Sequence, residues 1–230
     1  MPERATTPAI VSDLAIRLGG DHQGPQTVRF RQRGRMRQDE ASGWIRFRAS
    51  QSISLTDCAF DWRARTGPAG LVFVRDALTG GEGRVDVGFL GVLPIARVEA
   101  THQLNRGELI RYLAEIPWAP GAITRNSALR WRVEADRIFV ATGAGETSAE
   151  VMFTLDTDGR ISEAFATDRP RAVKGGFVDT PWCGRFCEYR RCGGALVPFA
   201  GAVSWVINGQ EVVVWEGRLK EWEHAGSLNL

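Results

Sequence analysis

Hydrophobic and polar residues alternate along much of this chain, and this alternation constrains the fold more than any other feature of the sequence. One segment alternates Ile45, Phe47, Ala49 and Gln51 with Arg46, Arg48 and Ser50. The same pattern returns at 60–65 and at 129–134. A period of two places successive side chains on opposite faces of a strand, so one face enters a core and the other contacts water. The sequence therefore predicts antiparallel strands.

Further strand-like segments follow in both halves of the chain, separated by short turns. They lie at 71–74, 84–87 and 92–98 in the first half, and at 138–141, 151–155, 161–167, 186–190, 202–207 and 211–215 in the second. Asn208-Gly209 is a favoured two-residue hairpin loop. Because no linker interrupts the chain, we interpret residues 1–230 as a single domain, with a first strand set at 25–100 and a second at 128–222.

A short helix is predicted near the N-terminus, at 7–18. Thr7 is a suitable N-cap, Pro8 suits the first helical position, and Gly19-Gly20 follows the last turn. The expected apolar stripe consists of Ile10, Leu14 and Leu18.

A longer, central helix is predicted at 105–117, between the two strand sets. Asn105 is its expected N-cap, and Glu108 completes a variant of the capping box. The stripe expected to face the sheet consists of Leu109, Leu113 and Ile116. Strands on both sides of one helix predict a mainly β (α+β) fold: a strongly curved antiparallel sheet, or half-barrel, with the central helix covering an apolar cavity. Eight tryptophans and eleven phenylalanines supply rings to line it.

The central helix also carries the candidate catalytic residues. Glu108, Arg111, Tyr112 and Glu115 follow one another at helical spacing. One interpretation is an exposed Arg111–Glu115 pair worth a few tenths of a kcal/mol. The other places Arg111, Tyr112 and Glu115 at the cavity mouth. There Arg111 would orient an oxygen atom, Glu115 would act as acid or base, and Tyr112 would donate a hydrogen bond.

Charge and cysteine usage narrow the classes of function. The net charge of +2 gives no general reason to expect a nucleic-acid partner. Arginine nevertheless recurs at every second position from Arg29 to Arg37, and again at Arg46 and Arg48. These arginines form either a solvated strand face or a patch for an anionic ligand.

The three clustered cysteines have a spacing that matches no common zinc or iron–sulfur pattern. They are Cys183, Cys187 and Cys192. We expect a structural role for them, with a redox or metal role as the alternative, and predict no metal and no cofactor. No signal peptide is recognised and no run of about 20 apolar residues is present, so we expect a soluble, cytoplasmic protein without a membrane span. The oligomeric state stays open.

Several segments together resemble a known family. The central segment is Arg111-Tyr112-Leu113-Ala114-Glu115 with Trp118. The others are Met36 with Gly43-Trp44-Ile45-Arg46-Phe47, Phe60-Asp61-Trp62, Leu129-Arg130-Trp131, Thr180-Pro181-Trp182 with Gly184-Arg185-Phe186 and Tyr189, and Leu196-Val197-Pro198 with Gly201 and Trp205. Over residues 25–220 the chain resembles a bacterial family of unknown function with an RYLAE-x-x-W signature. That family is similar in fold to the half-barrel of lipoprotein-localisation factors, which hold acyl chains in an apolar concavity.

The resemblance implies a bent sheet covered by helices, and it marks Arg111, Tyr112 and Glu115 as site residues. The expected ligand-binding residues are Trp62, Trp118, Trp131, Trp182 and Tyr189. Two functions follow. The first is binding of a hydrophobic small molecule or lipid in an aromatic-lined cavity. The second is a cofactor-independent enzyme (cyclase, isomerase, lyase or hydrolase) that uses Arg111, Tyr112 and Glu115, with Asp76 or Arg169 as helpers. The alternative to a helper role is a solvated position at a strand end for Asp76 and a position in a loop for Arg169.

Overall fold

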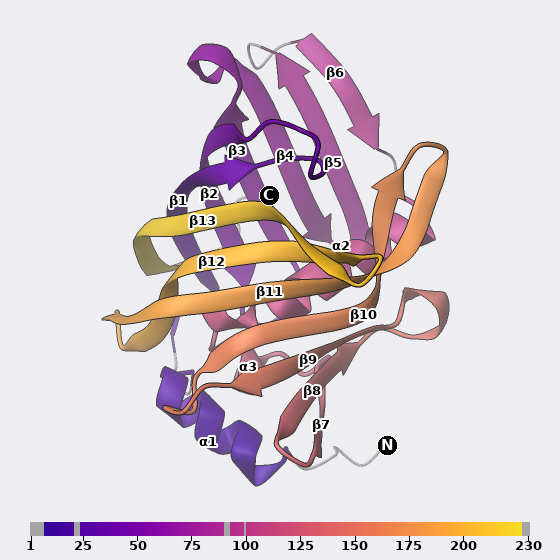
Figure 1. The fold of residues 1–230 in the computed structure, drawn as a ribbon. Coiled ribbons are helices and arrows are strands. Elements are labelled where there is room, and N and C mark those ends of the chain that lie inside the picture. The colour runs from indigo at the N-terminus through magenta and orange to yellow at the C-terminus, as the bar shows by residue number, and fades with distance from the viewer. Residues whose placement is uncertain (1–6, 21–23, 90–92, 99, 227–230) are drawn as a thin grey trace.

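One curled antiparallel sheet dominates the structure. The computed structural model describes residues 7–20, 24–89, 93–98 and 100–226. Within these ranges 13 strands form a half-barrel, which confirms the predicted fold class (Figure 1). Its first strands are β1 (Thr27–Met36), β2 (Ile45–Ser54), β3 (Phe60–Thr66), β4 (Val72–Thr79), β5 (Glu82–Phe89) and β6 (Leu93–Val98). The others are β7 (Arg130–Glu134), β8 (Arg137–Thr142), β9 (Ala149–Leu155), β10 (Ile161–Val173), β11 (Gly176–Cys192), β12 (Ala195–Ile207) and β13 (Gln210–Ala225). Residue 92, at the start of the predicted strand 92–98, lies outside the described residues.

The order of the strands explains where the central helix lies. The two strand sets join where β1 pairs with β13, and the sheet then runs outward to β6 on one side and to β7 on the other. The chain between these two edge strands contains helix α2 (His102–Ala114). A connection from one edge of a bent sheet to the other crosses its concave side, and α2 packs there against strands of both halves (Figure 1).

Three glycines lie side by side on the adjacent strands β1, β13 and β12. Gly34 lies opposite Gly217, and Gly217 lies opposite Gly201 on β12. A Cβ atom on Gly217 would overlap the Trp215 ring, and one on Gly201 would approach the Trp118 ring to 3.2 Å. The absence of side chains therefore lets two indole rings lie directly on the inner surface of the sheet.

Helix α1 (Ala9–Leu18) begins at Ala9 rather than at residue 7, and no side chain caps its first turn. Gly19 ends it in the left-handed conformation, with φ of 71°, as the Gly-Gly pair predicts. The predicted apolar stripe is wrong at Ile10, which is 36% exposed. The buried face consists of Val11, Leu14, Ala15 and Leu18.

Helix α2 begins one turn earlier than predicted. Its N-cap is Thr101, whose Oγ1 accepts a hydrogen bond from the Leu104 N–H at 3.1 Å. The predicted cap, Asn105, lies inside the helix, and its Oδ1 accepts a hydrogen bond from the Gly83 N–H of β5 at 2.8 Å. The predicted capping box is therefore wrong, because Glu108 lies in the second turn and is buried.

The C-terminal end of α2 leads into the aromatic core. Glu115 ends the helix, and a 3₁₀ turn, η2 (Ile116–Trp118), follows. The Trp118 ring lies 5.7 Å from Phe30, 5.2 Å from Phe186 and 6.2 Å from Trp215, measured between ring centroids. Its Nε1–H donates to the Pro198 carbonyl at 2.9 Å. Trp118 therefore joins the central helix to the inner face of β1 and β11–β13.

Three short elements remain among the described residues. They are α3 (Ala122–Arg125), η1 (Pro68–Gly70) and η3 (Gly145–Thr147). In the part of the chain that the structure describes, no helix is long and apolar enough to span a membrane.

The four cysteines are free thiols. Cys183 and Cys187 lie on the same face of β11, but Cys183 is buried and Cys187 is exposed. Burial raises the pKa of the Cys183 thiol to about 12, so this thiol stays protonated and poorly nucleophilic at neutral pH.

Candidate functional site

A cavity of about 290 Å³ lies between α2 and the concave face of the sheet. Its aromatic lining consists of Trp62, Trp118, Trp182, Phe186 and Trp215. Its polar lining consists of Gln32, Gln51, Asp76, Arg111, Glu115 and Arg169. A largely apolar cavity with a few convergent polar groups is the usual form of a small-molecule site.

Arg111 lies at the centre of the polar side of this cavity. Its Nε donates to Glu115 Oε1 at 2.9 Å, and its Nη1 donates to Asp76 Oδ2. The guanidinium also lies over the rings of Phe60 and Trp62, 4.6 and 5.6 Å from their centroids. Burial would lower the pKa of Arg111, but the carboxylates of Glu115 and Asp76 raise it above its ordinary value. The guanidinium therefore stays charged between two carboxylates.

Glu115 uses both of its carboxylate oxygens within the protein. Oε1 accepts from Arg111, and Oε2 accepts from Gln51 Nε2. Gln51 in turn accepts from Gln32 Nε2 at 3.2 Å. The Arg111–Glu115 pair exists as predicted, but the exposed-pair interpretation is wrong, because the two side chains are only 16% and 11% exposed. A carboxylate held by two donors is poorly placed to act as a free acid or base, so the geometry gives the enzyme hypothesis no support at Glu115.

Glu108, one turn before Arg111, is a buried carboxyl of the same cluster. Burial and the negative charge of Asp76 raise the pKa of Glu108 to about 8. Its carboxyl is therefore mostly protonated at neutral pH. Glu108 Oε2 and Asp76 Oδ1 are both buried acceptors without a donor. A hydrogen bond from the protonated Glu108 carboxyl to Asp76 also raises the pKa of Glu108.

Arg169 is the second cation of the cavity. It belongs to β10, next to a bulge between Ala166 and Arg169, so the alternative prediction of a loop is wrong. Proline has no N–H to donate to a neighbouring strand, but strands tolerate proline at bulges. The strand therefore continues through Pro170. Asp76 likewise lies within β4 and not at a strand end, and its side chain enters the cavity.

The guanidinium of Arg169 packs against two tryptophan rings and forms no ion pair with a described carboxylate. The group lies 5.0 Å from the Trp182 ring and 5.7 Å from the Trp205 ring. Among the described carboxylates none forms an ion pair with it, and its Nε–H lacks an acceptor. Burial lowers the pKa of Arg169, although the nearby Glu108 opposes that effect.

The structure brings some of the predicted site residues together and separates the others. Arg111, Glu115, Trp62, Trp118 and Trp182 all line the cavity.

Tyr112, Tyr189 and Trp131 do not line it. The Tyr112 hydroxyl donates to the Ser54 carbonyl at 3.1 Å and accepts from Asn126 Nδ2 at 2.9 Å, on another side of α2. Successive residues of a helix point about 100° apart, so Tyr112 and Arg111 face different neighbours.

The other two rings belong to the second strand set. The Tyr189 hydroxyl donates to the Ile161 carbonyl at 2.6 Å. Trp131 packs against Phe153 with 6.5 Å between ring centroids. Both rings are therefore parts of the core rather than of the cavity wall.

Gln32 and Gln51 are cavity residues that the sequence analysis missed, although the sequence contained a signal for them. Both occupy inward positions of strands whose other inward residues are mostly apolar. A polar residue at such a position needs a buried partner, and here the partner is Glu115 through Gln51.

The match to a known protein family covers nearly the whole chain. Residues 16–224 match the model of a family of unknown function, DUF6920. This chain belongs to that family. No curated protein matches its sequence.

Chains similar to this one occur among solved structures from several bacteria. A putative outer membrane lipoprotein-sorting protein domain from Vibrio parahaemolyticus is similar with a TM-score of 0.55 and 10% identity, over 95% of this chain and 92% of that one. A DUF1329 family protein from Desulfovibrio piger has a TM-score of 0.55 and 10% identity, over 98% and 95% of the two chains. A LolA superfamily protein from Nitrosomonas europaea has a TM-score of 0.49 and 13% identity, over 97% and 96%. At these identities the DUF6920 chain shares a fold with the first two.

Proposed function

We propose that the protein binds a hydrophobic small molecule or lipid in the cavity beneath α2, with an anionic head group at Arg169 and an apolar tail along the tryptophan rings. The observation that carries this proposal is a cation that forms no ion pair in an aromatic-lined cavity. Arg169 is held by Trp182 and Trp205 and has no acidic partner among the described residues. A carboxylate or phosphate from a ligand would complete that environment.

Other unpaired donors point to the same head group. The Nε1–H groups of Trp62 and Trp182 are buried without an acceptor, and both side chains line the cavity. A buried polar group without a partner costs about 1–3 kcal/mol. A head group rich in oxygen atoms satisfies these donors together with Arg169, whereas a purely apolar ligand leaves them unpaired.

The size of the cavity limits the tail. A volume of about 290 Å³ lies at the lower end of the range of small-molecule pockets, roughly 300–1,000 Å³. This favours an amphiphile with one apolar chain over a lipid with several. The fold of the Vibrio parahaemolyticus protein, described as a lipoprotein-sorting domain, is consistent with lipid binding, but a shared fold by itself does not assign a function.

Tryptophan fluorescence titration, supported by native mass spectrometry, tests this proposal with two probes of equal chain length, dodecanoate and dodecanol. We expect dodecanoate to bind with 1:1 stoichiometry. The variant Arg169→Gln should weaken dodecanoate binding roughly tenfold to a hundredfold, because a hydrogen bond to a charged group contributes about 1.5–3 kcal/mol. Its affinity for dodecanol should change little.

Two further variants serve as controls. Arg132→Gln removes an exposed arginine of β7 and should leave the affinity for dodecanoate unchanged. Val74→Trp places a ring in the cavity and should weaken binding of both probes. Failure of both probes to bind, or equal affinities in wild type and Val74→Trp, would contradict the proposal.

A further inference from the structure

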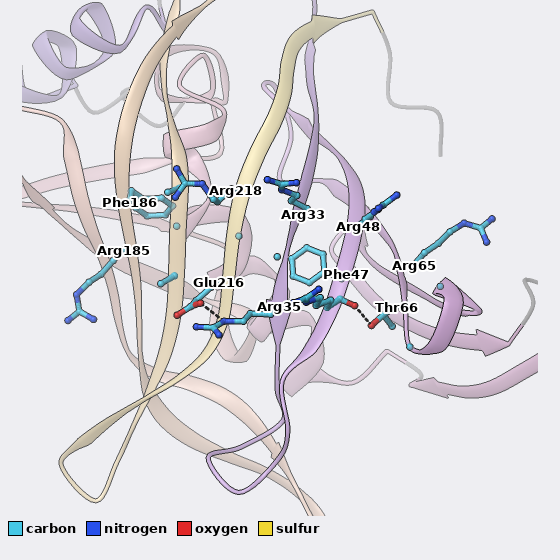
Figure 2. Close-up of a pocket in the computed structure, with 18 of the residues that line it drawn as sticks. Arg33, Arg35, Phe47, Arg48, Arg65, Thr66, Arg185, Phe186, Glu216 and Arg218 are labelled. Carbon is cyan, nitrogen blue, oxygen red and sulfur yellow. Dashed lines mark hydrogen bonds and ion pairs between the residues drawn. The ribbon is translucent and has the colours of Figure 1, made fainter.

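A row of arginines crosses the outer face of the sheet. Arg218 lies opposite Arg33, Arg33 opposite Arg48, and Arg48 opposite Arg65, on the adjacent strands β13, β1, β2 and β3. Figure 2 shows these four side chains along the same face. We call Arg33, Arg48, Arg65 and Arg218 the arginine row. Like charges directly opposite one another destabilise a sheet, so the row carries an energetic cost within the protein.

Most of the row is not neutralised. Arg218 bonds to Glu188, but Arg33, Arg48 and Arg65 are exposed and have no acidic partner among the described residues. Several neighbouring arginines on the same face do have an acidic partner.

Arg35 bonds to Glu216 at 2.6 Å, and Asp61 accepts from Arg63 at 2.8 Å and from Arg75 at 2.6 Å. The described carboxylates therefore pair with arginines beside the row and with Arg218, but not with Arg33, Arg48 or Arg65.

The shape of the surface favours an extended anionic partner. A hollow of about 1,330 Å³ runs over this face and includes the whole row. The turn η1 borders it, and Leu71, just after that turn, lines it with a side chain that is 37% exposed. Adjacent strands lie about 4.8 Å apart, so neighbouring guanidiniums present closely spaced forks for phosphate oxygens.

We propose that the arginine row docks the protein on a membrane that contains anionic phospholipids, with lipid phosphates between the guanidiniums and Leu71 against the interface. An apolar side chain beside arginines is typical of a surface that binds at the lipid–water boundary. The choice of a membrane over another polyanion rests on the proposed function, because a protein that carries an amphiphile exchanges it with a lipid phase.

Co-sedimentation with vesicles tests this proposal. Wild type should bind vesicles of phosphatidylcholine mixed with phosphatidylglycerol, and not vesicles of phosphatidylcholine alone. The variant Arg33→Gln/Arg48→Gln/Arg65→Gln should lose on the order of 100-fold in partitioning, since each arginine near an anionic surface contributes roughly fivefold. Because opposed like charges are removed, thermal melting of this variant should show a fold at least as stable as wild type.

A variant with the same change of charge separates local from general electrostatics. Arg130→Gln/Arg132→Gln/Arg137→Gln alters the edge hairpin β7–β8, at the far end of the sheet. It should keep most of the vesicle binding. An equal loss in both triple variants would overturn the proposal, as would binding of inorganic polyphosphate or duplex DNA without binding of anionic vesicles.

The cavity and the outer face are tested independently. Arg169→Gln should retain vesicle binding, and the triple variant of the arginine row should retain dodecanoate binding. If the wild type binds anionic vesicles but no amphiphile, only the proposed function is contradicted. If the wild type binds amphiphile but no anionic vesicles, only the docking proposal is contradicted.

Discussion

Arg111 and Glu115 lie one turn apart on α2 and are joined by a hydrogen bond of 2.9 Å beneath the curled sheet, with less than a fifth of either side chain exposed. A pair of this spacing is ordinary on the surface of a helix. In this structure Arg111 also donates to Asp76, and Glu115 also accepts a hydrogen bond from Gln51. Burial makes each member depend on the others, because a charge that loses its partner stays desolvated.

The first prediction concerns Arg111. We expect Arg111→Gln to lower the free energy of unfolding by about 3–5 kcal/mol, because Asp76 and Glu115 are left buried without a counter-charge. Urea denaturation followed by tryptophan fluorescence measures this. The control, Arg132→Gln, removes an exposed arginine of β7 and should cost less than about 1 kcal/mol. Similar losses in the two variants would show that the buried cluster does not stabilise the fold.

The second prediction concerns the dependence of stability on pH. The pKa of Glu108 is raised from 4.5 to about 8 in the native state. Between these values the native state binds a proton that the unfolded state has released. This contribution to stability is therefore fully present below about pH 4.5 and is lost as the pH rises to about 8, with a slope of at most about 1.4 kcal/mol per pH unit.

Glu108→Gln keeps the hydrogen-bonding shape of the protonated acid but does not titrate. We expect its unfolding free energy to vary less with pH across this range than that of wild type. We also expect it to exceed wild type at pH 8. Urea denaturation at several pH values compares the two proteins. Parallel curves would mean that Glu108 is ionised in the native state at neutral pH.

The third prediction concerns the neighbouring glycines of β1, β13 and β12. Gly217→Ala should destabilise the protein by about 1–3 kcal/mol, because the new methyl group occupies the position of the Trp215 ring. Displacement of that ring should also change the tryptophan emission spectrum. Gly43→Ala is a matched control, since nothing lies within 4 Å of a Cβ atom there. An unaltered spectrum and stability for Gly217→Ala would show that the ring does not rest on the sheet.

The fourth prediction separates Tyr112 from the cavity. Tyr112→Phe removes a buried hydroxyl that bonds Ser54 and Asn126. It should cost about 1–3 kcal/mol of stability, since the Ser54 carbonyl loses this donor and Asn126 Nδ2 keeps only the Cys58 sulfur as an acceptor. Dodecanoate affinity, measured under conditions where the variant is folded, should not change. A loss of affinity without a loss of stability would return Tyr112 to the binding site.

Local sequence patterns determine the inward faces of the strands and the charge pair on the central helix. The alternation of Ile45–Gln51 fixes which side chains of β2 enter the core, because the period of a strand is a property of the backbone. The spacing of Arg111 and Glu115 likewise fixes their contact through the helix alone. Helix boundaries were less certain, and Thr101 rather than Asn105 caps α2 because several residues in that region can start a helix.

Only the tertiary structure decided which residues share the cavity. Asp76 is 35 residues from Arg111 in sequence, Gln51 is 64 residues from Glu115, and Arg169 lies on the far half of the sheet. These groups meet because β1 pairs with β13 and thereby brings the two strand sets around α2. The sequence by itself determined the strands, their inward faces and the local charge pair on the helix. The closure and register of the sheet, which depend on contacts between distant segments, decided that this pair is buried and that Arg169 lines the cavity with its Nε–H unpaired.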